Sequence, residues 1–185
     1  MQQLQELKKI EDPVKKKAYF MALLSEEFRK RGAKEPIIVG GLAVEIYTQG
    51  SYTTGDIDIK ADITLLEEIL KNWGFKKTGR VWLNDYLDIY IDWLGSSLEE
   101  GEEAEKRVNA VLIDENLNVK IISIEDLIID RLNAYKWWKD EDSFLWAKIL
   151  LKIKERMEEQ IDLEYLKKRA KKEQIEDIVE KLLKK

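Results

Sequence analysis

The feature that most constrains this chain's fold is a β-branched run followed by two glycines and an apolar helical segment. Residues 37–39 read Ile-Ile-Val, Gly40 and Gly41 follow, and residues 42–47 are mostly apolar. A short β-branched run bounded by glycine is typical of a buried strand. A turn-rich link then leads into a second predicted strand. The stretch therefore predicts a strand–turn–helix–strand unit.

The second predicted strand carries two carboxylates. It reads Asp56-Ile57-Asp58-Ile59, and alternation with a period of two places both aspartates on one face. Two carboxylates side by side repel each other, and a hard divalent cation between them removes that repulsion. The alternative is a solvated edge strand with two surface aspartates, although Asp is disfavoured in strands. The pattern favours a nucleotide-and-metal site.

The paired glycines have two interpretations. Glycine lets backbone N–H groups approach a phosphate closely, and the helix N-terminus behind Gly40 and Gly41 favours negative charge there. The alternative is an ordinary turn between a strand and a helix. The stretch contains neither the Lys-Ser/Thr of a P-loop nor a GxGxxG pattern.

A third carboxylate is expected from residues 87–93, where polar and apolar side chains alternate again. Asp88 and Asp92 fall on the same face of this predicted strand. If the strand lies beside the one with the paired aspartates, three carboxylates surround one or two metal ions. We favour Asp92 as the third carboxylate and keep Asp88 as the alternative.

The absence of two residue types limits the chemistry. The chain has no His and no Cys, and 37% of its residues are charged, against about 25% in an average protein. These absences exclude Ser-His and Cys-His nucleophiles, His-ligated metals and disulfides. Carboxylate and Mg²⁺ chemistry remains. The same composition predicts a thermophilic source, since charge networks are enriched there.

Charge and hydropathy indicate the cellular location and the binding partners to expect. The N-terminus has no apolar signal core, and no run approaches about 18 apolar residues, so we expect a cytoplasmic protein without membrane contact. The net charge of −5 argues against general coating of nucleic acid and against stable DNA binding. A local basic groove is still compatible with this charge.

The remaining segments predict the surrounding architecture. Helices are expected to begin at Asp12-Pro13, where a capping residue precedes proline, and at Thr64, which has capping-box spacing with Glu67. Two hairpins are expected over 75–84 and 111–122. Four later helices are expected over 127–138, 142–157, 162–170 and 174–183. The order predicts an α+β core over 1–122 and a helical region over 123–185 packed on it.

Several cations are candidate phosphate ligands: Arg80, Arg131, Lys136 and Lys139. The alternative for Arg80 is an ordinary surface residue of a turn. Trp137 and Trp138 stand at helical spacing, and we expect at least one of them in the core. The basic run 167–172 is either a solvated helix face or a contact for RNA or a partner protein.

The central motifs resemble a known superfamily. Gly40-Gly41 followed by Asp56-Ile57-Asp58 is similar to the hG[GS]…DhD signature of DNA polymerase β-like nucleotidyltransferases. More narrowly, residues 39–43 with 54–58 resemble a family of small nucleotidyltransferase-like proteins related to abortive-infection toxins and minimal nucleotidyltransferases. The similarity spans residues 36–166. Later motifs also fit that family: Gly74-Phe75, Gly79-Arg80-Val81-Trp82, Ser123 to Ile128, Asp130 to Tyr135, and Trp138-Lys139-Asp140.

The resemblance implies a polymerase β palm-like mixed sheet flanked by helices. It implies that Asp56, Asp58 and Asp92 hold one or two Mg²⁺ ions. Gly40, Gly41 and Thr54 would then contact the phosphates of a nucleoside triphosphate, with ATP the expected substrate. One departure is that residues 51–54, Ser-Tyr-Thr-Thr, lack an arginine that relatives often carry.

Three functions follow from these patterns. The first is Mg²⁺-dependent transfer of a nucleoside monophosphate from a triphosphate to a hydroxyl on RNA, a protein or a small molecule. The second is a catalytically silent binding partner, such as one half of a toxin–antitoxin or regulatory pair, and the acidic segment 99–105 suits it. The third, a DxD glycosyltransferase, needs a larger sheet than this length allows.

Overall fold

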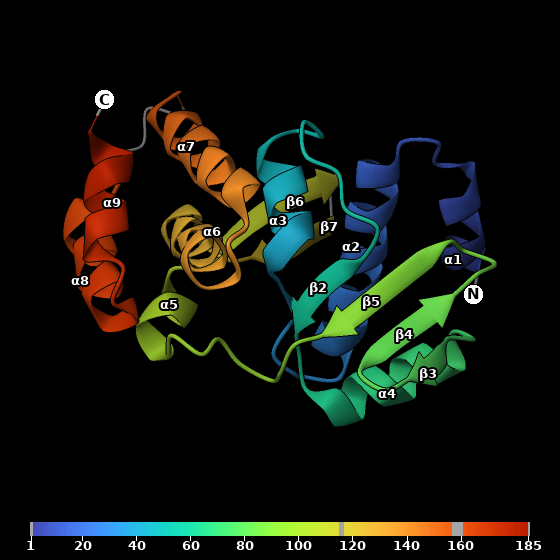
Figure 1. The fold of residues 1–185 in the computed structure, drawn as a ribbon. Coiled ribbons are helices and arrows are strands. Elements are labelled where there is room, and N and C mark those ends of the chain that lie inside the picture. The colour runs from blue at the N-terminus through green and yellow to red at the C-terminus, as the bar shows by residue number, and fades with distance from the viewer. Residues whose placement is uncertain (1, 115–116, 157–160, 185) are drawn as a thin grey trace. The chain divides into compact units, whose positions relative to one another are not determined.

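The computed structural model describes residues 2–114, 117–156 and 161–184 (Figure 1). The chain divides into two compact units, residues 1–122 and 123–185, which are described separately below. The expectation that the second unit packs on the first stays a prediction. Within the described ranges, every helix is too short or too polar to cross a membrane.

The first unit is built on a seven-stranded mixed sheet, in the order β3-β4-β5-β2-β1-β7-β6. β1 pairs in parallel with β7, and β2 pairs in parallel with β5, while the other neighbours are antiparallel. Figure 1 shows β2, β5 and β4 side by side. The bounds are Ile37–Ile38 (β1), Ile57–Lys60 (β2), Lys76–Thr78 (β3), Val81–Asn84 (β4), Ile89–Trp93 (β5), Asn109–Asp114 (β6) and Leu117–Ile121 (β7). The expected α+β class and mixed sheet are confirmed.

Helices surround this sheet, and the longest begins as expected. The Asp12 carboxylate accepts hydrogen bonds from the backbone N–H groups of Val14 and Lys15, at 2.9 and 3.1 Å. Pro13 needs no such partner because it has no N–H. The helices of this unit are α1 (Gln2–Glu6), the 3₁₀ turn η1 (Leu7–Lys9), α2 (Pro13–Lys30), α3 (Gly40–Tyr47), α4 (Ile63–Asn72) and α5 (Glu102–Lys106). α2 packs against β7, and α3 packs against β2.

Aromatic side chains fill part of the core of the first unit. Phe20 of α2 is fully buried, and its ring centroid lies 5.7 Å from Trp73 and 5.5 Å from Phe75. Trp82 of β4 is also fully buried. Burying a side chain as large as Phe contributes about 1.5–3 kcal/mol, so these contacts hold α2 against the segment that joins α4 to β3.

Two expected boundaries were wrong. Asp62, not Thr64, caps α4, because its carboxylate accepts a hydrogen bond from the Leu65 N–H at 2.9 Å and the helix begins one residue later. α3 begins at Gly40, so both glycines form its first turn instead of preceding it. The first hairpin is confirmed as β3 and β4. The second is β6 and β7, and its turn residues 115–116 lie outside the described residues.

The second unit is helical throughout its described residues, as expected. Its helices are α6 (Ile124–Trp138), α7 (Glu141–Arg156), α8 (Leu163–Glu173) and α9 (Glu176–Leu183). The Ser123 hydroxyl caps α6 by accepting from the Asp126 N–H at 3.1 Å. The expected end of the helix over 142–157, at Met157, lies outside the part of the chain that the structure describes.

A buried polar cluster connects α6 to α8. The Asp126 carboxylate accepts hydrogen bonds from the Ser123 hydroxyl at 2.8 Å and the Tyr165 hydroxyl at 2.7 Å. The Nε atom of Arg169 lies 3.3 Å from the same carboxylate. Asp126 is fully buried and Arg169 is 4% exposed. Since each buried charge faces its counter-charge, the cluster holds these helices together.

Candidate active site

The parallel pairing of β2 with β5 sets two of the predicted carboxylates next to each other. The register places Asp58 directly opposite Asp92, and paired residues of neighbouring strands project from the same face of a sheet. Asp56 is the residue immediately before β2, two positions from Asp58. Three of the carboxylates singled out in the sequence thus come from adjoining strands at one place in the sheet.

The first turn of α3, at Gly40 and Gly41, holds the Asp58 side chain in place. The Gly41 N–H donates a hydrogen bond to the Asp58 Oδ2 atom at 2.9 Å. Gly40 has φ of +54°, and a Cβ atom added to it would lie 2.2 Å from the same oxygen. A side chain at Gly40 would therefore displace the carboxylate. The N-terminus of α3 also favours the negative charge it faces.

The same turn also positions Asp56. The Thr54 hydroxyl donates a hydrogen bond to the Asp56 Oδ1 atom at 2.8 Å. A Cβ atom on Gly41 would lie 2.9 Å from the Thr54 hydroxyl oxygen, so glycine leaves room for this contact. The Gly41 N–H and the Thr54 hydroxyl, expected to face phosphates, donate to the two aspartates in this structure. Their role as phosphate ligands stays a prediction.

Asp92 is bound on one side only. Its side chain is 12% exposed, and its Oδ2 atom lies 2.7 Å from the terminal nitrogen of Arg80. Arg80 precedes β4, where Val81 pairs with Asp92, and its side chain is 65% exposed. The other oxygen of Asp92, Oδ1, is buried and has no hydrogen-bond partner among the described residues. This atom is free to accept a proton or a cation.

The structure separates Asp92 from the alternative third carboxylate. Asp88 is exposed, has φ of +53° and stands outside β5, which begins at Ile89. The strand expected to begin at residue 87 therefore starts two residues too early, because the chain is still turning at Asp88. Asp92 alone of these two lies opposite Asp58.

The carboxylate oxygens of Asp56, Asp58 and Asp92 are the kind of ligand that suits Mg²⁺, although the three groups do not converge on one point. Carboxylate oxygens are the ligands that Mg²⁺ prefers, and the Oδ1 atom of Asp92 would gain a partner from one. Across the described ranges, however, no three acidic side chains are close enough to hold one ion together. In this structure Asp92 pairs with Arg80, while Asp56 and Asp58 accept from Thr54 and Gly41.

Comparison with known proteins identifies the family to which the chain belongs. Residues 19–183 match the family described as nucleotidyltransferase of unknown function (DUF6036). The chain belongs to this family. No curated protein matches it. The matched range of this nucleotidyltransferase family member includes both glycines and all three aspartates, so the resemblance drawn from those motifs is confirmed at the family level. The family's description implies a nucleotide as its class of substrate.

Two of the three cations predicted in the second unit have local partners. Arg131 donates to the Asp130 carboxylate at 2.6 Å, and Lys136 donates to the Gln174 carbonyl. Lys139 ends α6 in a left-handed conformation. Their role as nucleotide ligands in this family member stays a prediction. The expectation that at least one of Trp137 and Trp138 is buried was wrong: they are 57% and 81% exposed, and both stand at the C-terminal end of α6.

Two residues that the sequence analysis missed connect α2 to the site. The Lys17 ammonium forms an ion pair with the Glu45 carboxylate of α3 and donates to the Thr54 carbonyl at 2.7 Å. The two side chains are 9% and 1% exposed. Lys17 lies just before the matched range of the family. A signal was present, because Lys17 and Glu45 each interrupt the apolar face of a helix.

Proposed function

We propose that this family member is a Mg²⁺-dependent nucleotidyltransferase. It would move a nucleoside monophosphate from a triphosphate, with ATP the expected donor, to a hydroxyl of RNA, a protein or a small molecule. The observation that carries the proposal is the register of β2 and β5, which sets Asp58 opposite Asp92 beside the glycine turn.

Each polar residue has a distinct part in this proposal. Asp56, Asp58 and Asp92 would hold Mg²⁺, which supplies neutralisation of the phosphate charge and a lowered pKa of the attacking hydroxyl. Thr54 orients Asp56 through its hydroxyl, and the Gly41 N–H fixes the Asp58 carboxylate. The Oδ1 atom of Asp92, buried and without a hydrogen-bond partner among the described residues, is the atom through which Asp92 would act, as a metal ligand or as the base for the acceptor's proton.

A transfer assay tests the proposal directly. The full chain is incubated with Mg²⁺, each of the four α-labelled triphosphates, and RNA or protein acceptors that include the chain itself. Asp58→Asn is expected to abolish labelling and to retain the fold, since the amide oxygen can still accept from the Gly41 N–H. Asp88→Asn is the matched control, because Asp88 is an exposed carboxylate outside β5. Transfer that persists in Asp58→Asn would rule out the assignment.

Arg80 is expected to compete with a cation for Asp92. Arg80→Gln removes the positive charge that occupies the Oδ2 atom of Asp92, so the protein should bind Mn²⁺ more tightly in the absence of nucleotide. The gain should be roughly 1.5- to 5-fold, because an exposed ion pair contributes about 0.2–1 kcal/mol. Manganese titration by electron paramagnetic resonance measures this affinity. Lys76→Gln, which removes an exposed charge on β3, is the control, and an equal affinity in both variants would contradict the competition.

The pairing of Arg80 with Asp92 also favours a second candidate function. A resident cation that neutralises Asp92 suits a nucleotidyltransferase fold that has become a binding partner, for example in a toxin–antitoxin pair. The two candidates differ in one property. A silent partner would not bind Mg²⁺ with a triphosphate, whereas the enzyme must.

A further inference from the structure

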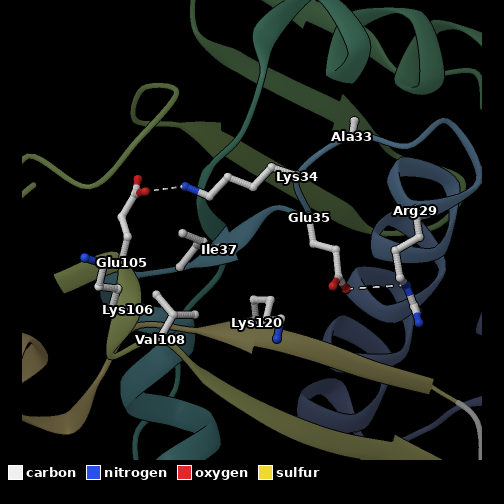
Figure 2. A pocket seen from close by; sticks show the side chains of 9 residues that line it. All are labelled: Arg29, Ala33, Lys34, Glu35, Ile37, Glu105, Lys106, Val108 and Lys120. Atoms are coloured by element: carbon white, nitrogen blue, oxygen red, sulfur yellow. Dashed lines mark ion pairs between the residues drawn. The ribbon is translucent and has the colours of Figure 1, made fainter. Parts of the chain in front are cut away.

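The first unit contains a pocket that shares no residue with the candidate active site. Its volume is about 430 Å³, which is in the usual range for small-molecule sites. Its walls come from the end of α2, the segment that enters β1, the end of α5 and strand β7. Figure 2 shows three apolar side chains in its lining, Ala33, Ile37 and Val108, and two ion pairs.

The two ion pairs of the pocket are not equally complete. The Lys34 ammonium lies 2.7 Å from the Glu105 carboxylate, and its hydrogen bond holds the pKa of Glu105 below the ordinary value. Arg29, by contrast, approaches Glu35 only through its Nε atom, at 3.5 Å. The Oε2 atom of Glu35 is buried and accepts no hydrogen bond from the described residues. Lys34 and Glu105 thus form a tight ion pair. Arg29 and Glu35 form a looser one, in which the terminal nitrogens of Arg29 and the Oε2 atom of Glu35 can still take part in hydrogen bonds with a ligand.

The pocket also has a surplus of positive charge. Four cations line it, Arg29, Lys34, Lys106 and Lys120, against the two carboxylates of Glu35 and Glu105. Half-buried Lys120 pairs with no carboxylate within 4.0 Å in the described ranges, and Lys106 meets only Glu102, at 3.9 Å. Lys120 is next to Ile37 in the parallel pairing of β7 with β1. An anion that reaches both Lys120 and the terminal nitrogens of Arg29 would receive charge-assisted hydrogen bonds.

We propose that this pocket binds a small phosphate monoester that also carries hydroxyl groups, such as a sugar phosphate. Arg29 and Lys120 bind the phosphate, since an arginine fork and an ammonium are the usual donors to it. The Oε2 atom of Glu35 accepts from a hydroxyl group of the ligand. Ile37 and Val108 contact its carbon skeleton. The proposal is independent of the nucleotidyl transfer described above.

Calorimetric titration of the full chain with ribose 5-phosphate, in the absence of divalent metal, tests the proposal. Saturable binding is expected, with weaker binding of inorganic phosphate and no binding of ribose. Lys120→Met should weaken ribose 5-phosphate roughly tenfold or more, because it removes a hydrogen bond to a charged group. Lys120→Arg should restore most of the affinity. Arg29→Gln serves as a second variant if Lys120→Met does not fold.

The remaining variants assign the binding to the pocket. Glu35→Met should lower the preference for ribose 5-phosphate over inorganic phosphate, since it removes the acceptor for the sugar, while the loss of its ion pair with Arg29 affects both ligands alike. Asp56→Asn/Asp58→Asn and the exposed-surface control Lys76→Met should bind ribose 5-phosphate as the wild type does. The proposal is overturned if ribose 5-phosphate shows no saturable binding, or if the folded Lys120→Met and Arg29→Gln variants bind as tightly as Lys76→Met. Loss of binding in Asp56→Asn/Asp58→Asn would also overturn it, because the ligand would then occupy the active site.

Discussion

Lys17→Met is expected to lower the free energy of unfolding by about 3–5 kcal/mol, because it leaves a buried carboxylate without its counter-charge. That carboxylate is Glu45, which is 1% exposed and has the Lys17 ammonium as its ion-pair partner. Denaturant unfolding followed by tryptophan fluorescence measures the loss. Lys15→Met is the matched control, since Lys15 is an exposed lysine on the same helix. Equal stability of the two variants would contradict the account of this pair.

The double variant Lys17→Met/Glu45→Met separates stability from the positioning of the site. Replacing both members of a buried ion pair by apolar side chains is often neutral or stabilising, so unfolding stability should return to near the wild-type value. The Thr54 carbonyl still lacks its donor, however, and Thr54 orients Asp56. Mn²⁺ should therefore bind more weakly to this stable variant. Wild-type Mn²⁺ affinity in the double variant would show that Lys17 serves stability alone.

Asp126→Ala is expected to destabilise the second unit by a similar amount, about 3–5 kcal/mol. The change removes the acceptor for the Ser123 and Tyr165 hydroxyls and the carboxylate 3.3 Å from buried Arg169. Amide hydrogen exchange in α6 and α8 measures the effect locally. The control is Asp130→Ala on the same helix, which should cost at most about 1 kcal/mol because its ion pair with Arg131 is half-exposed. Equal exchange in the two variants would contradict the role of the cluster.

Much of the fold was predictable because its signals are local. The strand–Gly-Gly–helix–strand order, the cap at Asp12 and the cap at Ser123 each depend on residues only a few positions apart. Alternation with a period of two similarly predicted that Asp56 and Asp58 share a face. The family confirms the interpretation of these motifs as those of a nucleotidyltransferase.

The features that were missed, or expected only conditionally, depend on contacts between distant segments. The sequence analysis expected the three carboxylates together only if their two strands were neighbours, and no local pattern reveals the parallel pairing that sets Asp58 opposite Asp92. The pairing of Arg80 with Asp92 follows from the same sheet. Lys17 and Glu45 break the apolar pattern of their helices, yet only the packing of α2 on α3 shows that the two breaks compensate each other.

The central claim is that the aspartates around the glycine turn form a working nucleotide–metal site. The most direct test is calorimetric titration of a non-hydrolysable ATP analogue in the presence of Mg²⁺, on the wild type and on Asp56→Asn/Asp58→Asn. The account predicts saturable binding to the wild type and none to the variant. Absence of binding to the wild type would contradict it and favour the silent partner, and equal binding to both proteins would place the nucleotide elsewhere.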